Sequence, residues 1–190
     1  MATNLRRLRA VDVPDVPVPD DISGYELVDG ALVPVMPSKR RHSWLCHKLA
    51  VRFEAHVERT GAGAVYPDVW CHLTLPYDPE RLRAPDVAYF SNERLAEAGE
   101  GDIFPFAPDL VVEVYSPSNL KRPGDFQQRV RDYLDAGVPR LWVVYPDARY
   151  AIAHRPDGWA RVVREHESLD GGDVLPGFSI PLGELFRGMP

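Results

Sequence analysis

The chain has 190 residues, of which 45% are hydrophobic and 26% are charged, enough to bury the core of one globular domain. Its net charge of −6 excludes a protein that coats nucleic acid through bulk positive charge, although a nuclease with its own carboxylates stays compatible. The sequence has no apolar run near the ~18 residues that a membrane span needs. Two cysteines and an N-terminus without an apolar signal segment favour a cytoplasmic protein.

Residues 1–20 are expected to form an extended, proline-rich arm, because Pro14, Pro17 and Pro19 prevent a helix over Val11 to Asp20. A single domain over residues 21–190 follows from this boundary. The domain is expected to begin near Tyr25 with a β-hairpin, since Asp29-Gly30 separates two short apolar runs.

A long helix is expected next, with Ser38 as its N-cap and its end near Arg59. Gly61 and Gly63 then stop it. Apolar residues recur at helical spacing along this segment, at Leu45, Leu49, Phe53 and Val57.

The rest of the chain alternates short strands with one more long helix. Apolar runs predict strands near 64–66, 71–75, 86–90, 110–115 and 141–145, and a helix is expected over about 124–136, ending at Gly137. A second hairpin is expected across 149–163, and Pro181 opens a short helix over Leu182–Phe186. This order predicts an α/β fold with a mixed sheet.

Two acidic residues stand inside or beside strongly apolar strands, namely Asp86 and Glu113. An ionised carboxylate in such a place must be paired, protonated or bound to a metal. Asp109 lies about 13 Å from Glu113 along the strand, too far to share one ion, and is expected to be a strand-entry residue. We therefore predict that Asp86 and Glu113 together bind a divalent cation. The alternative is that Glu113 forms a structural ion pair with an arginine.

The chain resembles the Uma-two family of restriction endonucleases, a branch of the PD-(D/E)XK nuclease superfamily. The resemblance is carried, in order, by Tyr25 to Gly30, His42, Pro85-Asp86, Ala107 to Val114, Ser116-Pro117-Ser118, Tyr133, Ala136 to Val138, Leu141 to Val144 and Leu175 to Phe178. It implies a restriction-endonuclease-like mixed sheet flanked by helices, with additional hairpins. It also implies a metal-dependent DNA endonuclease, often a homodimer, with Asp86 and Glu113 as ligands of Mg²⁺ or Mn²⁺.

The family pattern also includes a lysine, which this chain replaces by Arg129 on the second long helix. Arginine keeps the positive charge and grips phosphate oxygens, but it cannot give up its proton at a working pH. Lys121 is a possible substitute, with a solvated loop lysine as the alternative. Asp125, Arg129 and Tyr133 share one helical stripe.

Two further residues at positions of the family pattern are candidates for supporting roles. Glu26 is either a further ligand or orienting group, or an exposed hairpin acid. His42 either orients the site or is structural. Lys39, Arg40 and Arg41 precede it at the helix start, where either a phosphate docks or the three cations are simply solvated.

The sequence gives little support for zinc or thiol chemistry. Its two adjacent pairs, Cys46-His47 and Cys71-His72, cannot each supply two ligands to one ion, because neighbouring side chains point in different directions. Two functions therefore stay open: a metal-dependent endonuclease, and a nuclease-fold module without catalysis that binds nucleic acid or a protein partner.

Overall fold

The computed structural model describes residues 8–116 and 123–190. Its larger sheet has six strands in the order β11-β10-β9-β8-β6-β3. The strands β8 and β9 are parallel and the other neighbours are antiparallel, so the sheet is mixed, as predicted. Their bounds are β3 Ala64–Tyr66, β6 Val87–Phe90, β8 Leu110–Val114, β9 Arg140–Tyr145, β10 Tyr150–His154 and β11 Ala160–Arg164.

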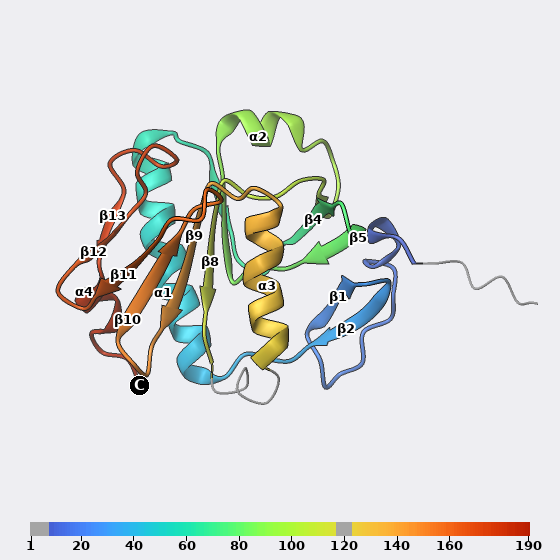
Figure 1. The fold of residues 1–190 in the computed structure, drawn as a ribbon, viewed down its shortest axis with the longest axis horizontal. Coiled ribbons are helices and arrows are strands. Elements are labelled where there is room, and N and C mark those ends of the chain that lie inside the picture. The colour runs from blue at the N-terminus through green and yellow to red at the C-terminus, as the bar shows by residue number, and fades with distance from the viewer. Residues whose placement is uncertain (1–7, 117–122) are drawn as a thin grey trace, which may run out of the picture.

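Two long helices cover opposite faces of this sheet (Figure 1). The first, α1 (Arg40–Thr60), packs its predicted apolar positions against Val87, Leu110 and Val112. The second, α3 (Pro123–Asp135), connects β8 to β9 and packs Phe126 and Tyr133 against the other face. Alternation along β8 therefore turns Val112 toward α1 and Glu113 toward α3.

The helix ends agree only in part with the sequence prediction. Lys39, not Ser38, is the N-cap of α1, and its side chain caps no backbone amide. At the other end Gly61 is in the left-handed conformation with φ 67°, and its amide bonds the carbonyl of Val57. A glycine takes this conformation without steric cost, which explains the stop.

A second sheet has the strand order β2-β1-β5-β4-β7. Its first two strands form the predicted hairpin around Asp29-Gly30. The strand β5 was not predicted, because its proline and charged residues lack an apolar alternation. The bounds are β1 Gly24–Val28, β2 Ala31–Val35, β4 Trp70–Leu75, β5 Asp78–Arg83 and β7 Ile103–Phe104.

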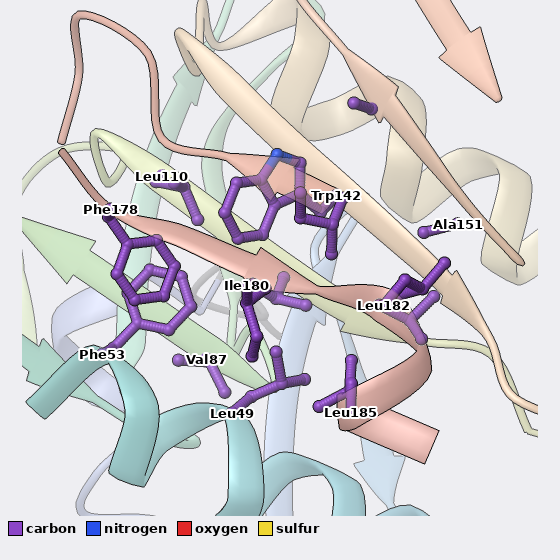
Figure 2. Close-up of a cluster of buried hydrophobic side chains, with 14 of the residues drawn as sticks. Leu49, Phe53, Val87, Leu110, Trp142, Ala151, Phe178, Ile180, Leu182 and Leu185 are labelled. Atoms are coloured by element: carbon purple, nitrogen blue, oxygen red, sulfur yellow. The ribbon is translucent and has the colours of Figure 1, made fainter. Parts of the chain in front are cut away.

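The C-terminal segments close the core on the α1 side. The ribbon of β12 (Ser168–Asp170) and β13 (Ser179–Pro181) and the predicted helix α4 (Leu182–Phe186) pack here. Figure 2 shows Phe178, Ile180, Leu182 and Leu185 meeting Leu49 and Phe53 of α1 beneath Trp142. Phe53 and Phe178 stack with ring centroids 4.3 Å apart.

The N-terminal arm is not wholly extended. Ala10–Asp12 forms one 3₁₀ turn that ends before Pro14, and Ala10 and Val13 are buried against Leu27 and Leu82. The boundary between an arm over 1–20 and a domain over 21–190 stays a prediction. A short helix, α2 (Asn92–Glu97), leads toward β7. None of the helices in the described ranges combines the length and apolarity needed to cross a membrane.

Candidate metal centre

Asp86 stands just before β6, and Glu113 lies within the neighbouring strand β8. Because β6 and β8 are antiparallel with Val87 paired to Val112, one further step of the same register sets Asp86 across from Glu113. Directly opposed residues on antiparallel strands have Cβ atoms about 4.5–5.5 Å apart. The fold therefore brings together the two carboxylates that the sequence nominates as metal ligands.

Asp86 is held between the sheet and the start of α1. Its Oδ2 accepts a 2.6 Å hydrogen bond from the amide of Val114 and lies 3.1 Å from Nε2 of His42. Burial alone would lower the pKa of His42, but the hydrogen bond and charge of Asp86 outweigh it and raise that pKa. His42 is thus a polar partner of the site, although an orienting role in chemistry stays a prediction.

Glu113 is buried, with 3% of its surface exposed, and faces Arg129 and Tyr133 of α3. Its Oε1 lies 3.4 Å from Nη1 of Arg129. Burial raises the pKa of Glu113 to about 8; Arg129 opposes this rise, and the charges of Asp86 and Glu26 reinforce it. Without a further cation, Glu113 is therefore protonated over much of the neutral range.

Glu26 is a buried ion-pair partner of Arg129, not an exposed hairpin acid. Its Oε2 lies 2.8 Å from both Arg129 Nη2 and Arg83 Nη1, and its Oε1 accepts a 2.9 Å bond from the amide of Ala84. Burial would raise the pKa of Glu26, but the charges of Arg129 and Arg83 outweigh it and lower the pKa. Glu26 therefore stays ionised where Glu113 does not.

A network of ion pairs behind Glu26 was missed by sequence reasoning. Arg83 also donates to Asp132 of α3 at 2.6 Å, and Arg81 reaches the same carboxylate at 3.1 Å. Asp132 is fully buried and both arginines are nearly so. The only sequence signal is the alternation of Arg81 and Arg83 around Leu82, which puts both cations on one face of β5.

The centre carries more acids than bases. Besides the Cys46 thiol and the Tyr133 hydroxyl, the charges that act on Asp86, Glu113 and their neighbours come from four carboxylates and two bases: Glu26, Asp68, Asp86 and Glu113, with His42 and Arg129. The buried hydroxyl of Tyr133 points at Glu113, and its hydrogen bond opposes the rise in the pKa of that carboxyl. Carboxylate oxygens are the donors that Mg²⁺ and Mn²⁺ prefer, so this set fits a hard divalent cation.

Cys46 also lies at the site, although the sequence analysis did not predict it there. It follows His42 by one helical turn, and its Sγ lies 3.5 Å from His42 Nδ1. Ligand atoms of His42, Cys46 and Asp86 all lie within 4.8 Å of one another. The cysteine pairs visible in the sequence obscured this i, i+4 relation between a histidine and a cysteine.

A cavity of about 170 Å³ opens beside His42. Lys39 is exposed at its edge, whereas Arg41 is bound to Asp147 at 2.6 Å. The lining residues are Lys39, Arg41, His42, Tyr115, Ser116, Pro146 and Asp147.

The structure brings six of the predicted residues into one site: Glu26, His42, Asp86, Glu113, Arg129 and Tyr133. Lys121 lies outside the described residues. Asp109 stands just before β8, where it accepts a 2.7 Å bond from the amide of Ser91, as a strand-entry residue should. The roles of these residues in binding and catalysis stay proposals.

A mixed sheet between α1 and α3, with one acid just before β6 and another on β8, is the arrangement of a restriction-endonuclease-like α/β protein. The model of the Uma-two family, described as "Putative restriction endonuclease", matches residues 15–183. The chain belongs to this family.

Among solved structures, the chain is similar to a "putative nuclease" from Anabaena variabilis ATCC 29413. The TM-score is 0.76 at 19% sequence identity, over 94% of this chain and 97% of the other. At this identity the likeness shows the shared fold. No curated protein matches the chain.

Proposed function

We propose that the protein is a metal-dependent DNA endonuclease that hydrolyses phosphodiester bonds, with Asp86 and Glu113 holding Mg²⁺ or Mn²⁺. The observation that carries the proposal is the pair of neighbouring carboxylates, Asp86 just before β6 and the buried Glu113 on β8, whose charges act on each other. Membership of a family described as restriction endonucleases supports the reaction class.

Bound to these carboxylates, the ion would lower the pKa of an attacking water and stabilise the charge that develops on the phosphoryl oxygens. Arg129 supplies a second positive charge and donors suited to phosphate oxygens. Burial lowers the pKa of Arg129, but the charges of Glu26 and Glu113 outweigh burial and raise this pKa. Arg129 therefore cannot act as a base. Glu26 positions Arg129 through their 2.8 Å contact.

The surroundings of the site suit a nucleic acid backbone. The cavity beside His42 has the exposed cation Lys39 at its edge, and Tyr115 in its wall offers a surface for a sugar or base. We further propose a homodimer, testable by light scattering of the purified chain. The free thiols of Cys46 and Cys71 suit a reducing cytoplasm.

Nicking of supercoiled plasmid with Mg²⁺ or Mn²⁺ tests the proposal. Asp86→Asn and Glu113→Gln are expected to lose cleavage, because each removes a metal-binding charge. Asp109→Asn is the matched control, since it neutralises an acid at the far end of the same strand. Equal cleavage by wild type and Glu113→Gln would contradict the proposed metal centre.

One observation favours a second function, a nuclease-fold module that binds nucleic acid or a protein partner without cutting. Arg129 contacts both Glu26 and Glu113, so a protein cation already neutralises part of the centre. Arg129→Lys separates the two functions. Cleavage gained by the variant from an inert parent would indicate that arginine ended the catalysis, whereas loss from an active parent would make Arg129 the working residue.

A further inference from the structure

We propose that His42, Cys46 and Asp86 form a binding site for a zinc-like divalent ion, distinct in its donor set from the proposed magnesium site. The three residues contribute one nitrogen, one sulfur and one carboxylate oxygen. Their ligand atoms lie within 4.8 Å of one another. This proposal is independent of whether the protein cleaves DNA.

The helix α1 and the larger sheet restrict the positions of the three donor residues. His42 and Cys46 are one turn apart on α1, so they share a face of a 21-residue helix. The first turns of this helix are fixed to the sheet by the contact of His42 with Asp86, whose carboxylate is in turn held by the amide of Val114. All three side chains are partly buried. The ion would therefore find its ligands already oriented.

The donor atoms lie close enough for one ion to bind all three residues. Zinc bonds sulfur at about 2.3 Å and nitrogen or oxygen at about 2.0–2.2 Å, so two ligands of one tetrahedron are about 3.5 Å apart. Cys46 Sγ is 3.5 Å from His42 Nδ1, and Asp86 Oδ2 is 3.1 Å from His42 Nε2. These two contacts use different ring nitrogens, so the His42 side chain would rotate until one nitrogen, the sulfur and the oxygen surround a single ion. Three protein ligands leave one position for water or a substrate oxygen.

The identity of the donors selects the ion. Thiolate and imidazole favour Zn²⁺ and Co²⁺, whereas Mg²⁺ and Mn²⁺ favour carboxylates and water. On binding, the Cys46 thiol releases its proton to solvent and the resulting thiolate forms the metal–sulfur bond. Burial raises the pKa of the Cys46 thiol, and the charges of Asp86, Asp68 and Glu113 raise it further, so the thiolate would form only as the metal binds. The same acids would attract a cation.

The shared ligand has a consequence that rests on the proposed function. Asp86 belongs to both donor sets, so zinc at His42 and Cys46 would take a ligand from the magnesium site. Zinc would then inhibit cleavage in the wild type, and removal of the thiol would weaken that inhibition.

The first test is spectroscopic and uses Co²⁺ as the probe, in a reductant that is not a thiol. Wild type is expected to show the near-ultraviolet charge-transfer band of a cobalt–thiolate bond. Cys46→Ser should lose the band, while Cys71→Ser, which removes the other thiol from a fully buried position, should keep it. Absence of the band in folded wild type would overturn the proposal.

The second test is calorimetric titration with Zn²⁺ and, separately, Mn²⁺. Cys46→Ser should weaken zinc binding by at least ~10-fold and leave Mn²⁺ binding unchanged. Glu113→Gln should do the reverse, so failure of the zinc site and failure of the proposed endonuclease centre give different patterns. Unchanged zinc affinity in Cys46→Ser would show that the thiol is only a hydrogen-bond partner of His42. Thermal unfolding of each variant confirms that it is folded.

Discussion

Replacing Glu113 by glutamine is expected to stabilise the protein against unfolding at neutral pH, in the absence of divalent ions. Glu113 is buried and its pKa is raised to about 8 by burial, with Asp86 and Glu26 adding to the effect against the opposing charge of Arg129. The unfolded chain has the ordinary glutamate pKa of 4.5. A native pKa above the unfolded one means that the native state holds a proton that the unfolded state has lost.

The sign and size of the effect follow from linkage. The contribution of Glu113 is fully present below about pH 4.5 and is lost as the pH rises toward 8. Between about pH 5 and pH 7 the wild type is expected to lose roughly 2–3 kcal/mol through this group. Glutamine has no proton to exchange, so the variant does not lose this stability. The free energy of unfolding of the variant relative to wild type should therefore rise by roughly 2–3 kcal/mol over this range.

Urea unfolding with a chelator at both pH values measures this difference. Titrating groups that do not interact with Glu113 cancel, because they are unchanged between wild type and variant. Glu54→Gln, on the exposed side of α1, is the matched control and should differ from wild type equally at both pH values. If Glu113→Gln behaved like this control, Glu113 would be ionised in the native state and the argument for a missing cation would fail.

Three further substitutions test the fold by urea unfolding. Arg83→Met should lower the free energy of unfolding by about 3–5 kcal/mol, because it leaves buried carboxylates without their cation. Arg131→Met, which removes an exposed ion pair, should lower it by less than about 1 kcal/mol. Gly63→Ala should cost more than about 2 kcal/mol, since its Cβ would lie 2.1 Å from the carbonyl oxygen of Phe90 at a φ of +110°. Phe53→Ala should cost about 3–5 kcal/mol by opening a cavity in the core of Figure 2. A smaller loss for Arg83→Met than for Arg131→Met would refute the buried network.

Elements with a local signal were predictable from the sequence. Asp29-Gly30 sets the geometry of its hairpin, and Leu45 to Val57 repeat at helical spacing, so each element is encoded in neighbouring residues. The cap of α1 was misplaced by one residue because Ser38 has the chemistry of an N-cap but makes no capping bond to the helix. Boundaries depend on such single interactions, which a pattern does not contain.

The parts of the site that were missed depend on distant partners. The strand β5 turns Arg81 and Arg83 inward, and they become buried only because Asp132 of α3 lies there, about fifty positions along the chain. Read locally, Asp78 to Arg83 is a charged turn. Likewise, in the sequence Cys46 is an ordinary helix residue, and only the fold places Asp86 beside it. The family resemblance supplied Glu26 and Arg129, which local patterns alone would not have joined.

The buried arginines also explain why the carboxylate charge of Glu26 is compensated while that of Glu113 is compensated less. Glu26 takes one hydrogen bond from an amide and two contacts from Arg83 and Arg129, so its burial is compensated. Arg83 is fixed in turn by Asp132, which leaves it no freedom to move toward Glu113. Buried ion pairs contribute little net stability, but they hold side chains in one arrangement. Here they tie Arg129 to Glu26 at 2.8 Å and leave it 3.4 Å from Glu113. The network thereby keeps one carboxylate of the centre available for a cation.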